Sequence, residues 1–145
     1  MTRTTILLIF GLLVAGTAWA HQGVKNPAVM ARMEAMGRIK AATAILGKMA
    51  KGSLPHDAEK AEEARLELIR TAGNIPMRFE VRASDPKSEA LPVIWENWED
   101  FTARAGEMAR AAKALDATTE ATIRAGMGKL AASCAGCHKV YRVEK

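Results

Sequence analysis

The sequence predicts an all-α fold, an antiparallel up-and-down four-helix bundle, and three observations lead to this prediction. Helix-favouring residues such as alanine, methionine, leucine, glutamate and lysine dominate the chain after residue 20. No convincing stretch there alternates apolar and polar residues with the period of two that is typical of a β-strand. Apolar residues instead recur at steps of three and four, which places one buried stripe on each helix.

The first twenty residues are expected to form a cleavable signal peptide. Arg3 stands in a short charged start, an apolar run follows at 6–15, and Ala-Trp-Ala at 18–20 has the small residues of a signal peptidase site. The apolar run is shorter than the roughly 20 residues that span a bilayer, which argues against an uncleaved membrane anchor. We therefore expect a single mature domain at residues 21–145, exported to the periplasm without stable membrane insertion.

The first helix of this domain is predicted to begin at Asn26–Pro27. Asparagine caps a helix well, and proline fits the first helical position because its missing N–H group would have no partner there. Gly52 predicts the end of this helix after about Lys51. The apolar stripe of the helix is Val29, Met33, Met36, Ile39, Thr43, Leu46 and Met49.

The second and third helices are separated by the longest irregular segment that we expect. The second helix is predicted from about residue 57 to residue 72 or 75, with Pro76 just beyond its end. The segment 77–92 contains two prolines and is predicted to be a loop. The third helix is predicted at 92–115, with the stripe Ile94, Trp98, Phe101, Ala105, Met108, Ala112 and Leu115.

The fourth helix is expected at about 119–141, and it carries both cysteines of the chain. Its apolar stripe is Ile123, Met127, Leu130, Cys134, Cys137 and Tyr141. His138 follows Cys137 directly, and residues three and four apart share a helix face. We therefore expect Cys134, Cys137 and His138 to meet at one place inside the bundle.

The Cys-x-x-Cys-His pattern in an exported chain is the attachment signature of c-type haem. Two thiols one helical turn apart can add to the two vinyl groups of one haem, and the adjacent imidazole can bind the iron. A disulfide between the two cysteines would restrain little of the unfolded chain. A structural zinc site needs four ligands, and only His21 and His56 remain as further imidazoles. A thioredoxin-type redox pair needs a βαβ context that this chain lacks. The pattern predicts one covalently bound haem c.

Positive charge is concentrated around this motif. Residues 21–120 hold 15 Lys and Arg against 15 Asp and Glu, whereas residues 121–145 hold five basic residues against one acidic residue. Two interpretations stay open: a solvated basic tail, or a surface that attracts an acidic redox partner protein. Nucleic acid is not expected as a partner, because no nucleic-acid-binding motif accompanies the basic residues.

The chain resembles the class II c-type cytochromes, the cytochrome c′ family, over essentially all of residues 25–145. "CAGCHKVYR" is similar to the family's haem motif followed by an aromatic residue and an arginine. Arg32 and Met36 resemble a recurrent arginine–apolar pair in the family's first helix. "KMAKGSLPHDA", "NIPMRF" and "IWENWEDF" resemble further family segments in the expected order. The resemblance implies a four-helix bundle that binds haem near its C-terminal helix.

The resemblance also implies roles for single residues. Cys134 and Cys137 would hold the haem, and His138 would bind the iron. Met36 would lie on the opposite side of the iron, as a sulfur ligand in low-spin members or as an apolar cover in five-coordinate members. Met33, one turn earlier, is an alternative for that place.

Two arginines have implied roles beside the haem. Arg32 would contact a haem propionate, and its alternative is a solvated residue on the helix face. Arg142 would reach the proximal side of the haem, and its alternative is a charge that favours the end of the last helix.

These features predict a protein that carries single electrons and catalyses no reaction on a substrate. The alternatives are a five-coordinate binder of nitric oxide or carbon monoxide, and an accessory structural bundle. Family members often pair through their first two helices, so a homodimer is an alternative to a monomer. A bundle packed to normal density has no room for a porphyrin, so the polypeptide alone should contain a cavity between its first and last helices.

Overall fold

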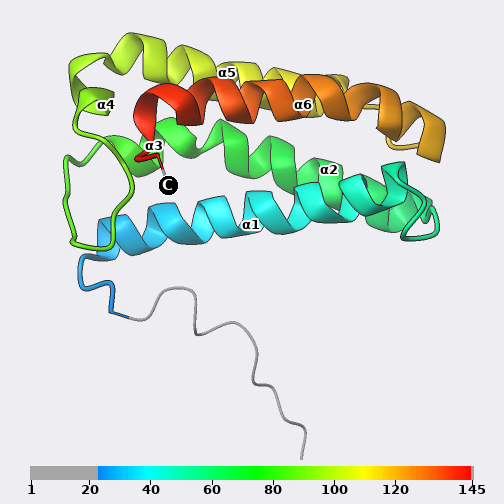
Figure 1. The fold of residues 1–145 in the computed structure, drawn as a ribbon, viewed down its shortest axis with the longest axis horizontal. Helices are drawn as coiled ribbons and strands as arrows, with labels where there is room; N and C mark the ends of the chain where they lie inside the picture. The colour runs from blue at the N-terminus through cyan, green and yellow to red at the C-terminus, as the bar shows by residue number, and fades with distance from the viewer. Residues whose placement is uncertain (1–22, 145) are drawn as a thin grey trace, which may run out of the picture.

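A computed structural model describes residues 23–144, and the predicted signal peptide at 1–20 lies outside them. Four long helices lie side by side in a bundle (Figure 1), joined by two short ones. In chain order the helices are α1 (Pro27–Ala50), α2 (Ala58–Gly73), α3 (Ile75–Phe79), α4 (Val93–Glu96), α5 (Trp98–Ala114) and α6 (Glu120–Tyr141). α1 and α5 each pack against both α2 and α6. The predicted four-helix bundle is confirmed, and within residues 23–144 no helix is long and apolar enough to cross a membrane.

The predicted starts of the first, second and fourth long helices are confirmed by their caps. The Asn26 side chain accepts hydrogen bonds from two backbone N–H groups in the first turn of α1. Asp57 caps α2 in the same way, and Thr119 forms a reciprocal capping pair with Thr122 at the start of α6. Gly52 has a φ of 69°, a conformation that glycine adopts without steric cost, and the chain turns there after α1.

Two segments differ from the prediction. Pro76 lies beyond the end of α2, as expected, but it stands in the first turn of a short helix that was not predicted, α3, where proline is well tolerated. Part of the expected loop 77–92 is therefore helical. The expected third helix is divided at Asn97, whose φ of −114° and ψ of 45° separate α4 from α5.

The core lies between the four long helices, and its largest fully buried side chains are apolar. They include Leu46, Met49, Leu68, Ile94, Ile123 and Leu130. Burial of each such side chain contributes about 1.5–3 kcal/mol relative to exposure. The stripe of α1 is rotated from the predicted one in its first half, because Arg32 and Ala35 are buried there while Met33 and Met36 are half-buried.

The loop at 80–92 contacts both the residues before the first helix and the residues after the last helix. The Asp85 carboxylate accepts hydrogen bonds from the backbone N–H groups of residues 25–26, just before α1. Ala90 forms an isolated antiparallel bridge with Arg142, just after α6. The start of α1 and the end of α6 are therefore held at the same end of the bundle (Figure 1).

Candidate haem site

The two cysteines lie one turn apart on α6, and both are free thiols. Each is half-buried and packs against the hydrophobic core. Burial raises the pKa of both thiols, and the nearby charge of Arg104 acts in the opposite direction on Cys137. The helix thus presents two sulfur atoms to the inner side of the bundle, as predicted.

His138 is exposed, and the prediction that it lies inside the bundle with the cysteines was wrong. A helix turns by about 100° per residue, so His138 lies about 40° beyond Cys134 and away from the centre of the stripe. Partial burial of the ring lowers the pKa of His138, and the positive charge of Arg142 lowers it further. Both effects favour the neutral imidazole, which is the form that binds metals, at the edge of the bundle.

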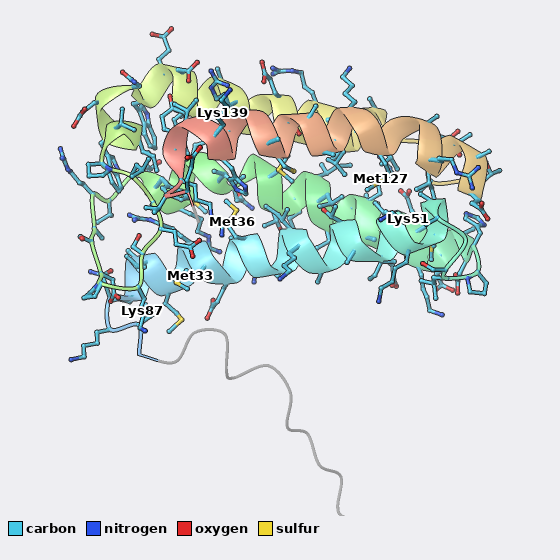
Figure 2. All side chains as sticks on the ribbon, in the orientation of Figure 1. Met33, Met36, Lys51, Lys87, Met127 and Lys139 are labelled. Carbon is cyan, nitrogen blue, oxygen red and sulfur yellow. The ribbon has the colours of Figure 1, made fainter. Side chains whose placement is uncertain are left out.

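Met36 lies on the side of α1 that faces the other helices (Figure 2). It is half-buried and packs against the same core as Cys134 and Cys137. Met33 is also half-buried but lies outside this group of core-packed side chains. The structure therefore separates the two methionines that sequence reasoning had left as alternatives for one place.

The cavity predicted between α1 and α6 finds no support. α1 and α6 pack against each other. One pocket found in the described part of the chain is lined by residues 96–103, around the α4–α5 junction. Another lies between α1, α2 and α3. Neither of these pockets lies between α1 and α6, so the cavity predicted there stays a prediction.

Arg32 is buried, with an exposed fraction of 3%. Its guanidinium donates hydrogen bonds to three backbone carbonyl groups that follow one another along α3 and the next loop, those of Arg78, Val81 and Ala83. The same group lies over the rings of Phe79 and Trp95. The interpretation of Arg32 as a solvated residue is therefore wrong. Its contact with a haem propionate stays a prediction.

Arg142 lies four residues after His138 and is exposed. Its Nε donates to the Glu89 carboxylate at 2.7 Å, so the end of α6 is paired with the 80–92 loop by charge as well as by backbone contacts. The proximal role that the family resemblance implies for Arg142 stays a prediction.

A polar group between α5 and α6 was missed by sequence reasoning. The Tyr141 hydroxyl donates to the Asp100 carboxylate at 2.5 Å, and Arg104 Nε donates to the same oxygen atom at 2.6 Å. Arg104 Nη1 donates to the Gly136 carbonyl at 3.1 Å. Burial and the Asp100 carboxylate raise the pKa of Tyr141 to about 12. The spacing of Asp100 and Arg104, four residues apart on one helix, was the only signal in the sequence.

The donor set fits covalent haem and does not fit zinc. In residues 23–144 no group of three or more His, Cys, Asp or Glu side chains could hold a metal ion. His56, a zinc candidate from the sequence, has its Nε2 at 3.0 Å from the Ala117 carbonyl, beside the start of α6 rather than its end. Two free thiols one turn apart, followed by an imidazole, are the side chains that a c-type haem needs.

A family model described as "Cytochrome C'" matches residues 27–142. The chain belongs to the cytochrome c′ family. It is 33% identical to a cytochrome c-556 of Agrobacterium fabrum over 144 residues, which cover 97% of this chain and 94% of that protein.

Solved cytochrome c′ structures share the fold. The structure from Rhodopseudomonas palustris is 24% identical, with a TM-score of 0.76, and the match covers 83% of this chain and 99% of that one. A cytochrome c′ variant from Alcaligenes xylosoxidans, solved as a nitric oxide complex, is 24% identical with a TM-score of 0.72. That match covers 81% of this chain and 94% of that chain. As a monohaem member of this family, the protein carries one covalently bound haem c, and Cys134 and Cys137 fit its attachment.

Proposed function

We propose that this cytochrome is a periplasmic electron carrier that acts on no substrate. In this proposal Cys134 and Cys137 hold the haem, and His138 and Met36 bind the iron from its two sides. A haem with imidazole and thioether ligands supplies one-electron chemistry at a raised reduction potential. The signal peptide predicted at 1–20 supports the periplasmic location.

The observation that carries the proposal is the placement of Met36. It packs against the core together with both cysteines, although it comes from α1 and they come from α6. Thioether sulfur is a soft, polarisable donor that suits haem iron. An unbranched side chain on this side of α1 can bind there and also exclude water from the iron.

The partner is proposed to be an acidic redox protein that docks near the end of α6. Within residues 23–144, Arg124 and Arg142 are paired with Glu120 and Glu89. Lys129 and Lys139 are exposed, and Lys139, labelled on α6 in Figure 2, directly follows His138 in the sequence. Charges of this kind speed the encounter with an acidic partner, and the effect weakens as ionic strength rises.

Absorption spectra of the exported protein test the ligand assignment. They should be recorded oxidised, reduced, and reduced with carbon monoxide, for the wild type, Met36→Ala and the matched control Met33→Ala. We expect low-spin spectra that carbon monoxide does not change in the wild type and in Met33→Ala. Met36→Ala should become high-spin and bind carbon monoxide.

The alternative is a five-coordinate protein that binds nitric oxide or carbon monoxide, with Met36 only covering the iron. A solved relative with nitric oxide bound is the observation that favours it. A high-spin wild-type spectrum that shifts with carbon monoxide would replace the electron-carrier proposal with this one. A wild-type chain without covalent haem would contradict both.

A further inference from the structure

The backbone turn between the two cysteines is held from outside α6. Gly136 lies between Cys134 and Cys137, and its carbonyl accepts a hydrogen bond from Arg104 Nη1 on α5. A Cβ atom at Gly136 would lie 3.8 Å from Arg104 Nη1, an ordinary contact distance, so the guanidinium lies directly against this residue. α5 thus contacts the main chain of the cysteine motif directly.

The Arg104 guanidinium is itself fixed at its other edge. Its Nε donates to Asp100, and the same carboxylate oxygen accepts the Tyr141 hydroxyl. Tyr141 is buried, with an exposed fraction of 3%, and its ring meets the Phe101 ring edge-on at 5.3 Å. A planar guanidinium bound at both edges has one orientation, so its hold on the Gly136 carbonyl is directional.

We propose that Arg104 is a positioning residue for the haem motif, which orients the last turn of α6 and thereby the His138 ring. Gly136 and His138 belong to the same helical turn. The hydrogen bond from Arg104 to the Gly136 carbonyl therefore affects the orientation of this turn, and with it the direction in which the His138 side chain leaves the backbone. This inference rests on the proposed function, in which His138 binds the haem iron.

The test compares three variants of the exported holoprotein with the wild type. Arg104→Met removes the guanidinium, and Arg104→Lys keeps the positive charge but not the planar fork. Arg110→Met is the matched control, because it removes the same charge from the same helix. The Arg110 guanidinium lies along α5 itself, beside Gly106. The readouts are the hyperfine-shifted proton NMR signals of the His138 ring and the reduction potential.

We expect the His138 signals to shift in Arg104→Met and in Arg104→Lys, and to stay in place in Arg110→Met. The potential should fall in Arg104→Met, since this change removes a positive charge beside the cysteine motif, and it should fall less in Arg104→Lys, which keeps that charge. If Arg104→Met does not accumulate, Asp100→Asn weakens the hold on the guanidinium by removing the charge of its acceptor, without changing side-chain size, and should shift the same signals.

Normal haem content with unshifted His138 signals in the Arg104 variants and in Asp100→Asn would overturn this inference alone. Shifts no larger than those of Arg110→Met would do the same. Absence of haem c from the wild-type chain would overturn the proposed function, and this inference with it.

Discussion

Replacing Arg32 by methionine should destabilise the fold severely, although methionine keeps an unbranched apolar stem like that of arginine. Arg32 is buried and donates to three backbone carbonyls, at 3.0 Å to Arg78 and 3.1 Å to Ala83, with Val81 as the third. Hydrogen bonds to charged groups contribute about 1.5–3 kcal/mol each. Val81 is exposed, so water can replace part of what its carbonyl loses. We expect a loss of about 3–5 kcal/mol, which is a large part of a typical stability of about 5–15 kcal/mol.

The assay is urea unfolding followed by far-UV circular dichroism, with tryptic cleavage at Arg82 as a local probe of the loop. Arg38→Met is the matched control on the same helix, since the Arg38 guanidinium is half-exposed and meets Glu67 at 3.5 Å. Exposed ion pairs contribute about 0–1 kcal/mol, so this variant should unfold near the wild-type midpoint. If Arg32→Met loses no more stability than Arg38→Met and its 80–92 loop resists trypsin, the hydrogen bonds from Arg32 to the three carbonyls do not stabilise the fold as expected.

Two glycines of α6 should respond in opposite ways to alanine, and an aspartate should give an acid-dependent stability. A Cβ at Gly126 would lie 3.0 Å from Leu115 Cγ, so Gly126→Ala should lower the stability by about 1–3 kcal/mol through overpacking, and the better helix propensity of alanine should offset about 1 kcal/mol of that loss. Gly128→Ala meets nothing within 4 Å and should stabilise by about 1 kcal/mol; equal urea midpoints for the two variants would contradict this. The pKa of Asp85 is held below its ordinary value of 3.8 by hydrogen bonds from the backbone N–H groups of Lys87, Lys25 and Asn26. Its carboxylate therefore stabilises the fold above that value, and this contribution is lost as the pH falls toward the lower folded-state pKa. Asp85→Asn should flatten the fall in urea midpoint below about pH 4, and an unchanged acid profile would show that Asp85 does not cause it.

Local signals account for the parts of the fold that the sequence predicted. The caps at Asn26, Asp57 and Thr119 bind backbone N–H groups within one turn of their own helix, so a few consecutive residues were enough to predict them. Pro76 lies beyond α2 as predicted, but α3 was missed, because proline fits both the residues after one helix and the first turn of the next, and the choice depends on tertiary packing. Arg32 was expected in solvent because its carbonyl partners lie 46 to 51 residues away along the chain.

In the candidate site, too, features formed by neighbouring residues were predicted and contacts between distant residues were not. The motif at Cys134, Cys137 and His138 is contiguous, so its spacing alone predicted a covalent haem. The exposed position of His138 follows from how α6 is rotated against its neighbours, because His138 lies at the margin of the apolar stripe rather than at its centre. The contact from Arg104 to Gly136 joins residues 32 apart, and the sequence shows no pattern that links them.

The contacts of the 80–92 loop have a consequence for the order of elements along the chain. Asp85 holds the residues before α1, while Glu89 accepts a backbone hydrogen bond from Val143, after α6. A circularly permuted chain, with a short linker from residue 143 to residue 25 and new termini in the exposed turn at 51–53, would preserve every helix contact. In that permutant the cysteine motif would be synthesised before α1. Comparing its haem content with that of the natural order would show whether haem attachment requires the other three long helices to precede the motif in synthesis.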